Sequence, residues 1–319
     1  MNKIVTLGGG GGQSRVLEAI KSLPNIDITA ICPNTDSGGS TGILRRQYGG
    51  GGYVGDLTKC ITALCNDQRL SSALSFRYQN GALNGHSAKN LLFHALEKTN
   101  GAVSAIESMS DICGLDRHRV IPISLEKTEL CASLKTGLTV TSETNINELA
   151  RNPLWTPGHH AIEEIYLQPK VKIWDVTARA IKDADHIIIC PGDLYSSILP
   201  IFLPTGTREA IKKSRAEISI IVNIVNKRGE TDGYKTEDFV SKIEKSLGRK
   251  ANRIVCNDAL VPLRVLAQQS LEKKDVLLTP NIRDKRFTSA PLARTDREGR
   301  IWSDPREIRE VLKFITHKQ

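Results

Sequence analysis

Two kinds of pattern alternate along most of the chain, short apolar runs and longer amphipathic segments. The apolar runs are rich in β-branched residues, which is typical of strands buried on both faces. They occupy residues 4–7, 26–32, 187–190, 218–225, 253–256 and 275–278. The amphipathic segments predict helices at residues 14–20, 57–64, 70–78, 91–96, 102–113, 175–184, 207–213, 236–246, 262–270 and 305–315. Strands that alternate with helices pair in parallel through right-handed crossovers. We therefore expect an α/β fold, an open parallel sheet with helices on both faces.

The periodicity changes between about residues 118 and 170. Short alternating runs at 120–123, 130–134 and 162–167 are separated by polar turns. They predict a small antiparallel patch, or edge strands, inserted into the main fold. No repeat or linker divides the rest of the chain, so we expect one α/β domain over residues 1–319 with an insertion at about 118–170.

Composition narrows the class of protein. The chain has 319 residues, of which 39% are hydrophobic and 25% charged, as in soluble globular proteins. Aromatic residues make up 5%, which argues against stacking platforms for single-stranded nucleic acid. The net charge of +9 is spread out, which suits a polyanionic small molecule and gives no support for nucleic-acid binding. No apolar stretch approaches the ~20 residues of a membrane span. Since the start of the chain shows no signal peptide, we expect a cytoplasmic protein that does not bind membranes. The apolar strands of the insertion could pair across a homodimer.

The seven cysteines form no C-x-x-C pair, and most lie inside apolar runs. This pattern predicts buried free thiols in a reducing compartment and no zinc site. His159 and His160 are neighbours, but adjacent side chains on an extended chain point to opposite faces. We therefore expect no metal there.

Five glycines, Gly8 to Gly12, follow the first strand, and the next helix is expected to begin at Ser14. Glycines let a ligand approach the backbone, and the positive end of a helix attracts an anion. The spacing matches neither the dinucleotide fingerprint nor the P-loop. We predict that phosphate binds Gly9, Gly10, Gly11 and Gly12; the alternative is a flexible turn without a ligand.

Residues 34–56, after the second strand, are expected to form a long polar loop. The loop carries the carboxylate of Asp36 and many hydrogen-bond donors. This composition is suited to binding phosphates and a metal ion, although a disordered surface insertion remains the alternative. The predicted phosphate ligands are Gly38, Gly39, Ser40, Thr41, Arg45 and Arg46.

Further candidates follow along the chain. Asp56 is either the N-cap of the helix at 57–64 or a ligand of the metal. His86 and Asn90 lie four residues apart, on one face of the first turn of a helix, and serve either the site or a cap. Three more polar candidates, Gly192, Ser196 and Asn223, come from segments at the ends of the third and fourth strands. Loops that follow parallel strands gather at one edge of the sheet, where ligands bind. Their composition predicts a phosphorylated ligand.

Several of these motifs together resemble the YvcK/CofD-like family, which contains gluconeogenesis factors and 2-phospho-L-lactate transferases. The resemblance covers roughly residues 4 to 235. Its motifs are Gly8–Gly12, Asp36–Gly42 with Leu44-Arg45-Arg46, Gly55-Asp56-Leu57, Gly85-His86-Ser87 with Asn90, Pro191–Ser197 and Gly229–Gly233. The Gly-Gly-Ser-Thr-Gly loop with Leu44-Arg45-Arg46 is more similar to the gluconeogenesis-factor branch.

The resemblance implies a Rossmann-like core that binds a nucleotide diphosphate. In the gluconeogenesis-factor branch the ligand is a uridine diphospho-sugar, and the role is regulation of carbon flux, cell-wall precursor supply and cell shape. In the transferase branch a phospholactyl group moves from a guanosine diphospho-lactate donor to the hydroxyl of a deazaflavin. We expect the regulatory role first, with Asp36 and Asp56 holding Mg²⁺ or a ribose hydroxyl and Asn90 orienting a phosphate or base. The alternative is a Mg²⁺-dependent transferase in which His86 is the general base. A third possibility is a scaffold whose glycine loops bind another protein.

The chain departs from the family pattern at six positions. The family usually has Thr at Gly11, Asp at Ser37, Gly at Lys89 and Ser at Asp193. Near the C-terminus, Trp302-Ser303-Asp304-Pro305 stands where relatives often have Arg-His-Asp-Pro. These departures bear on which nucleotide and which sugar would bind.

Overall fold

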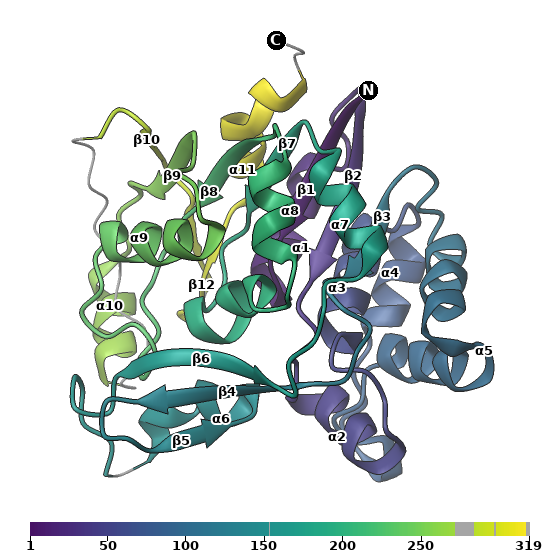
Figure 1. The fold of residues 1–319 in the computed structure, drawn as a ribbon, viewed down its shortest axis with the longest axis horizontal. Coiled ribbons are helices and arrows are strands. Elements are labelled where there is room, and N and C mark those ends of the chain that lie inside the picture. The colour runs from purple at the N-terminus through teal and green to yellow at the C-terminus, as the bar shows by residue number, and fades with distance from the viewer. Residues whose placement is uncertain (153, 272–283, 297, 317–319) are drawn as a thin grey trace.

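Seven parallel strands form one twisted sheet in the computed structural model, which describes residues 1–152, 154–271, 284–296 and 298–316 (Figure 1). In spatial order the strands are β10 (Phe287–Ala290), β9 (Arg253–Asn257), β8 (Glu217–Ile221), β7 (His186–Ile189), β1 (Asn2–Leu7), β2 (Ile26–Cys32) and β3 (Arg119–Pro122). The strand predicted at 275–278 lies outside the described residues. β10, which follows it, was not indicated by the sequence pattern.

The strand order reverses at β1. Leu7 pairs with Ile31 of β2 on one side and with Ile189 of β7 on the other. The chain thus builds β1, β2 and β3 outward in one direction, and then returns to β7 and builds β8, β9 and β10 in the other. The turns that follow β1 and β7 diverge at this point, which makes it the expected ligand position in an open α/β sheet.

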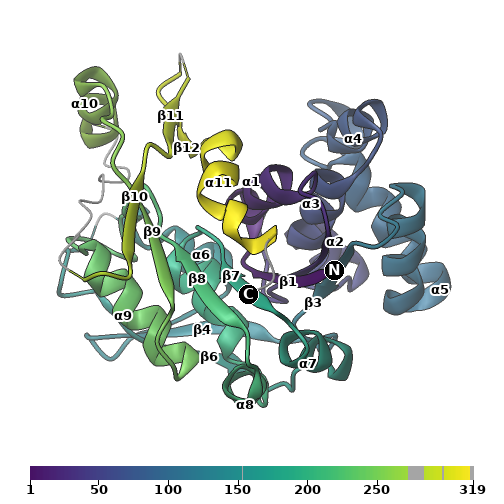
Figure 2. The same cartoon turned by 90° about the horizontal axis from the view of Figure 1, so that it is seen from above.

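Helices cover both faces of the sheet, because alternate residues of each strand point to opposite sides (Figure 2). One face packs against α1 (Gly10–Ile20), α3 (Val54–Leu64), α5 (Ala88–Ile112) and α11 (Pro305–Leu312). The other packs against α7 (Asp175–Lys182), α8 (Thr207–Lys213) and α9 (Thr236–Leu247). Ile4 and Ile188 belong to the first core, and Val5 and Ile187 to the second. The predicted fold class is confirmed.

Several further elements surround this core or contribute to it. They are α4 (Gln68–Ser75), α10 (Leu263–Leu271), the β11–β12 hairpin (Ala293–Thr295 and Ile301–Ser303), the 3₁₀ turns at Gly81–Leu83, Leu149–Arg151, Leu199–Phe202 and Lys313–Thr316, and the π-helical turn η3 (Leu194–Ile198). Across the described residues, no helix is both long and apolar enough to cross a bilayer.

The insertion forms a three-stranded antiparallel sheet beside the carboxyl edge of the main sheet (Figure 1). Its strands are β5 (Thr139–Thr141), β4 (Glu129–Leu134) and β6 (Ile162–Gln168), and the short helix α6 (Glu143–Asn147) follows β5. The run at 120–123 does not belong to this patch. It forms most of β3, which pairs in parallel with β2, because the buried Val120 and Ile121 extend the main core.

Three other element predictions are wrong. The helix expected from Ser14 begins at Gly10, so the glycines form its first turn. The loop expected at 34–56 contains a helix, α2 (Gly39–Tyr48), which is anchored by the buried Leu44. The strand expected to reach residue 225 ends at Ile221. The seven cysteines are buried free thiols, as predicted.

Candidate functional site

A cavity of about 300 Å³ opens at the switch point, between the turns that follow β1 and β7. We call it the switch-point cavity. Its walls bring together segments that are far apart in sequence, including Gly9–Gly12, Asp36, Asp56, Glu143, Gly192 and Ser196. The convergence of loops expected from the sequence is therefore present in the structure.

A second cavity of about 320 Å³ adjoins the first and lies against the start of α2, so we call it the α2 cavity. Its walls include Gly38, Gly39, Ser40, Thr41, Lys89 and Asn90. Asp36, Lys59 and Glu143 line both cavities. The two hollows are thus adjoining parts of one site.

Four helices begin at this site. α1, α2, α3 and α5 each contribute residues of their first turns to its walls, and in none of the four does the N-cap residue itself make a side-chain cap hydrogen bond. The first N–H groups of a helix lack partners within the helix and carry its positive dipole end. Four such ends favour a ligand with more than one negative group, such as a diphosphate.

Gly12 is required where α1 approaches the turn after β7. A Cβ on this residue would lie 1.9 Å from the carbonyl oxygen of Pro191. Gly10 has a φ of +61°, a conformation that L side chains rarely adopt. The glycine run therefore lets the first turn of α1 form flush against the neighbouring turn, at the wall of the cavity.

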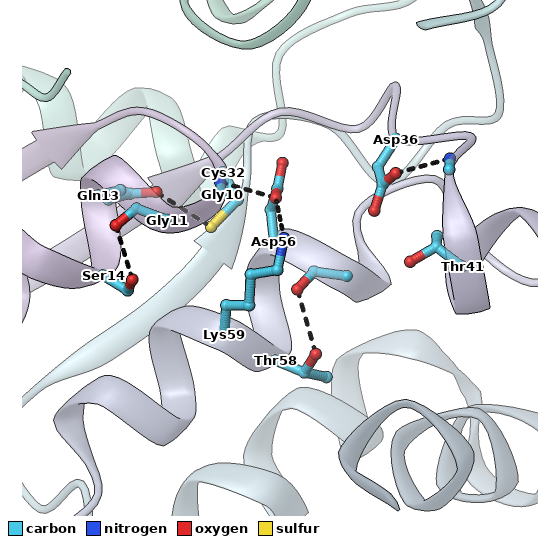
Figure 3. A network of polar contacts seen from close by, with 12 residues as sticks. Gly10, Gly11, Gln13, Ser14, Cys32, Asp36, Thr41, Asp56, Thr58 and Lys59 are labelled. Atoms are coloured by element: carbon cyan, nitrogen blue, oxygen red, sulfur yellow. Dashed lines mark hydrogen bonds and ion pairs between the residues drawn. The ribbon is translucent and has the colours of Figure 1, made fainter. Parts of the chain in front are cut away.

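Asp56 holds the first turns of α1 and α3 together. Its Oδ1 accepts a hydrogen bond from the N–H of Gly10 at 2.7 Å and lies 3.8 Å from Nζ of Lys59 (Figure 3). It is the third residue of α3, whose N-cap is Tyr53, so the N-cap interpretation of Asp56 is wrong. Burial lowers the pKa of Lys59, but Asp56 and Asp36 more than compensate and raise it above its ordinary value.

Asp36 lies against the start of α3, and its Oδ1 accepts a hydrogen bond from the N–H of Gly38 at 2.9 Å (Figure 3). The space for its other oxygen exists because residue 55 is glycine, where a Cβ would be 2.1 Å from Oδ2 of Asp36. Burial, followed by the nearby Asp56, raises the pKa of Asp36 to about 6. Asp36 therefore exchanges its proton close to neutral pH.

Glu143 is a site residue that the sequence analysis missed. It is the first residue of α6, in the insertion, and it lines both cavities. Burial, followed by the nearby Asp36 and Asp56, raises its pKa to about 7. No local motif marks Glu143, because its place in the site depends on how the insertion packs on the main sheet. Lys59 was also missed, although its position one turn after Asp56 could have indicated it.

His86 and Asn90 occupy different places. The Nδ1 of His86 lies 3.0 Å from Oγ of Ser40, behind the wall of the α2 cavity, and His86 precedes the N-cap of α5. The side chain of Asn90 accepts a hydrogen bond from Thr58 Oγ1 at 2.7 Å and faces the α2 cavity. The structure thus brings Asn90 into the site. His86 contacts Ser40, which lines the α2 cavity, but does not line the cavity itself.

Arg45 and Arg46 lie outside both cavities. Arg45 donates to the carbonyl oxygen of Thr128 at 2.5 Å and pairs with Glu129 at 2.8 Å, which joins α2 to the insertion. Arg46 is exposed, and both guanidiniums border a separate cavity of about 490 Å³ that also contains Lys127. That cavity is also lined by Gly42, Gly49 and Gly50, and the phosphate contacts of the two arginines stay a prediction.

The turn after β7 is held by its own neighbours. The N–H of Gly192 donates to Oδ1 of Asn223 at 2.6 Å, and Oγ of Ser196 lies 2.9 Å from oxygens of Asn147 and Glu230. Asn223 follows the end of β8 and so supports the turn from behind. Gly192 and Ser196 border the cavity, but these polar groups already have partners.

The residues that differ from the usual family pattern lie at several places around the site. Ser37 bonds Thr144 of α6 at 3.0 Å. Lys89 lines the α2 cavity, and burial followed by the nearby Lys59 lowers its pKa to about 8. Asp193 pairs with Lys227 at 3.0 Å at the edge of the switch-point cavity. Trp302 lies in β12, two residues before Asp304, the N-cap of α11.

The site offers few ligands to a metal ion. Within the described residues, no group of three or more His, Cys, Asp or Glu side chains lies close enough to hold one. Mg²⁺ is usually bound through one or two carboxylates together with water and the phosphates of a ligand. Asp36 and Asp56 fit that arrangement, since the two carboxylates face the same cavity. They would hold the ion only with a phosphorylated ligand present.

Comparison with known proteins agrees with this geometry. The family model described as 2-phospho-L-lactate transferase CofD matches residues 4–289. The chain belongs to the CofD family. Relatives in this family include a protein of Halalkalibacterium halodurans named "Gluconeogenesis factor", 35% identical over 249 residues, which are 77% of this chain and 74% of that protein.

Two further relatives support the family assignment. A Thermotoga maritima protein named "Putative gluconeogenesis factor" is 34% identical over 275 residues, 86% of this chain and 84% of that protein. A crystal structure of a UPF0052 family member from Bacillus halodurans superposes with a TM-score of 0.88 at 29% identity, covering 98% of this chain and 99% of that one. The CofD-like resemblance and its leaning towards gluconeogenesis factors are both confirmed.

Proposed function

We propose that this protein binds a nucleoside diphosphate attached to a sugar, together with Mg²⁺, and acts as a cytoplasmic regulator of carbon flux and cell-wall precursor supply. The observation that carries the proposal is the meeting of four helix N-termini with Asp36 and Asp56 at the switch point. The relatives named gluconeogenesis factor support the regulatory part.

Different groups of the site would contact the two phosphates and the Mg²⁺ ion. The N–H groups of Gly11 and Gly12 would meet one phosphate, and those of Ser40 and Thr41 would meet the other. Asp36 and Asp56 would share Mg²⁺ with the phosphate oxygens, and the ion would neutralise charge there. Lys59 lies between these groups and would contact a phosphate once Mg²⁺ has engaged Asp56.

The test is thermal unfolding with UDP-sugars, GDP, NAD(P) and a deazaflavin, each with and without Mg²⁺. A ligand at one hundred times its dissociation constant should add about 2.7 kcal/mol to the free energy of unfolding. We expect a Mg²⁺-dependent rise of Tm with UDP-sugars. No rise with any nucleotide would refute the proposal.

A second candidate function is group transfer to a hydroxyl, as the name of the family model suggests. One observation favours it: Asp36 and Glu143 have pKa values raised to about 6 and 7, which suits a group that accepts the proton of an attacking hydroxyl. Positioning and charge neutralisation would supply the rest of such a reaction. Turnover of a guanosine diphospho-acyl donor with a deazaflavin would establish this function in place of the regulatory one.

A further inference from the structure

Glu230 is a buried carboxyl group that the proposed ligand does not touch. It lies between β8 and α9 and is 4% exposed. Its Oε2 accepts hydrogen bonds from the N–H groups of Tyr195 at 3.0 Å and Ser196 at 3.3 Å. Glu230 therefore caps η3, the π-helical turn that follows the switch-point turn.

The other oxygen of Glu230 takes part in a contact that needs an extra proton. Oγ of Ser196 lies 2.9 Å from Oε1 of Glu230 and 2.9 Å from Oδ1 of Asn147. A hydroxyl carries one hydrogen, and an amide oxygen only accepts. With the amide nitrogen of Asn147 facing Glu143, both contacts are full hydrogen bonds when Oε1 of Glu230 carries a proton and donates it to Ser196. The hydroxyl hydrogen of Ser196 is then directed to Asn147.

The same chain of hydrogen bonds reaches the ligand site. The amide nitrogen of Asn147 donates to Oε1 of Glu143, which lines both cavities. The donors then point one way, from Glu230 through Ser196 and Asn147 to Glu143. This path links the switch-point turn of the main sheet to α6 of the insertion.

The groups that face Glu230 favour its neutral form. Burial, followed by the nearby Asp193, raises the pKa of Glu230 to about 8. Lys227, which pairs with Asp193, lowers the pKa of Glu230 but does not offset these two effects. The hydroxyls of Tyr195 and Tyr234 bond to each other at 2.8 Å nearby. On the side away from the ligand site, Glu230 borders a cavity of about 400 Å³ whose charged walls are Lys135, Lys242, Glu163 and Asp232.

We infer that Glu230 is a positioning residue: as a neutral acid it directs the Ser196 hydroxyl towards Asn147 and so holds Glu143 in place at the ligand site. Its effect on ligand binding rests on the proposed function, whereas its protonation does not. When Glu230 ionises, the Ser196 hydroxyl turns back to the carboxylate, and Oδ1 of Asn147 loses its donor. Glu143 then loses its fixed orientation, and binding weakens.

The first test needs no ligand. Glu230→Gln keeps an N–H donor for Ser196 and an oxygen acceptor for the backbone, but it has no proton to lose. A native state that retains a proton which the unfolded state releases loses stability as pH rises. The Tm of wild type should therefore fall relative to that of E230Q between about pH 5 and pH 8. Titration of Asp36 and Glu143 is common to both proteins and cancels in the comparison. A Tm difference that stays constant with pH, or that changes in the opposite sense, would overturn the inference.

The second test measures binding of UDP-glucose with Mg²⁺ between pH 6 and pH 9. Above pH 8 the affinity of wild type should fall by up to roughly tenfold per pH unit, the limit for one linked proton. E230Q should lack this fall, and Glu230→Ala should bind weakly throughout. Ser196→Ala should also bind weakly but keep the pH-dependent Tm of wild type, because it removes the link and leaves the acid.

The matched control is Asp232→Asn, which removes an exposed acid two residues away and should leave the fall above pH 8 unchanged. If wild type and E230Q lose affinity alike above pH 8, the inference fails while the proposed function stands. If no nucleotide binds, the proposed function fails, and the Tm comparison still decides whether Glu230 is protonated.

Discussion

At the scale of single residues, the site depends on glycines that differ in what surrounds them. Gly11 and Gly12 are adjacent in the first turn of α1, yet a Cβ on Gly11 would have no heavy atom within 4 Å, whereas one on Gly12 would clash with Pro191. Neighbouring positions in one glycine run therefore carry different constraints. The family usually has Thr at residue 11, and the open space around Gly11 would accommodate a side chain there.

Gly12→Ala is expected to push α1 away from the turn after β7. Overpacking of this kind typically costs about 1–3 kcal/mol of the free energy of unfolding, and nucleotide affinity should fall with it. Gly11→Ala is the matched control. It adds the same methyl group to open space and should leave stability unchanged or raise it by up to about 1 kcal/mol, as helix propensity predicts. Urea unfolding of both variants checks this, and an equal loss in the two would show that α1 does not press on Pro191.

Asp36→Asn should raise the stability of the protein while weakening its binding of nucleotide. The pKa of Asp36 is raised from 3.8 in the unfolded chain to about 6, so its contribution to stability is full below about pH 4 and is lost as pH rises through 6. At pH 7 the neutral Asn should raise the free energy of unfolding by on the order of 2 kcal/mol, since one pKa unit corresponds to about 1.4 kcal/mol. Mg²⁺-dependent nucleotide binding should weaken at the same time.

Calorimetric unfolding and titration with nucleotide, each at pH 5 and pH 7, test both parts. The gain in Tm should be small at pH 5 and larger at pH 7. Undiminished Mg²⁺-dependent affinity in the variant would remove Asp36 from the metal site.

At the scale of elements, α2 and the insertion are joined by a small number of polar contacts. Arg45 reaches Thr128 and Glu129 from α2, and Ser37 reaches Thr144 of α6. Because Glu143 precedes Thr144, these contacts also set the distance between the main domain and the carboxylate that the insertion contributes. The two arginines of the Leu-Arg-Arg motif differ in this respect, since only Arg45 makes such a contact.

Arg45→Ala should therefore cost stability, by about 1–3 kcal/mol, because it removes charge-assisted hydrogen bonds that are partly shielded from water. Arg46→Ala, at an exposed position, should change stability by less than about 0.5 kcal/mol. Thermal unfolding compares the two. If Arg46→Ala instead lowers nucleotide affinity, its guanidinium contacts the ligand, as the sequence pattern alone predicts.

The sequence pattern predicts elements well where burial dictates them. β1, β2 and α8 fall within two residues of their expected bounds because apolar residues recur with the period of a strand or a helix. α2 escaped prediction because it begins with Gly39, Ser40 and Thr41, which are poor helix formers, and buries little apolar surface beyond Leu44. Such a helix is held by tertiary contacts, which have no local pattern.

At the scale of the whole molecule, some site residues can be predicted from a local pattern and others depend on tertiary contacts. Gly9–Gly12, Asp36 and Asp56 were predicted because they follow strands, and the carboxyl ends of parallel strands share one edge. Glu143 and Glu230 were not predicted, because their roles depend on contacts between the insertion, η3 and the segment before α9. Arg45 and Arg46 line neither cavity of the site, and their contact with a ligand stays a prediction.

The position of β7 beside β1 has a consequence for how the protein becomes competent to bind. During synthesis the first glycine turn and both aspartates leave the ribosome early, but the turn that Gly12 packs against begins at Pro191. A nascent chain that has not yet reached β7 lacks Gly192, Asp193, Ser196 and Ser197, which close one side of the switch-point cavity. The remaining walls, and all of the α2 cavity, come from residues before β7. The last side of the site is therefore added only when the two halves of the sheet meet.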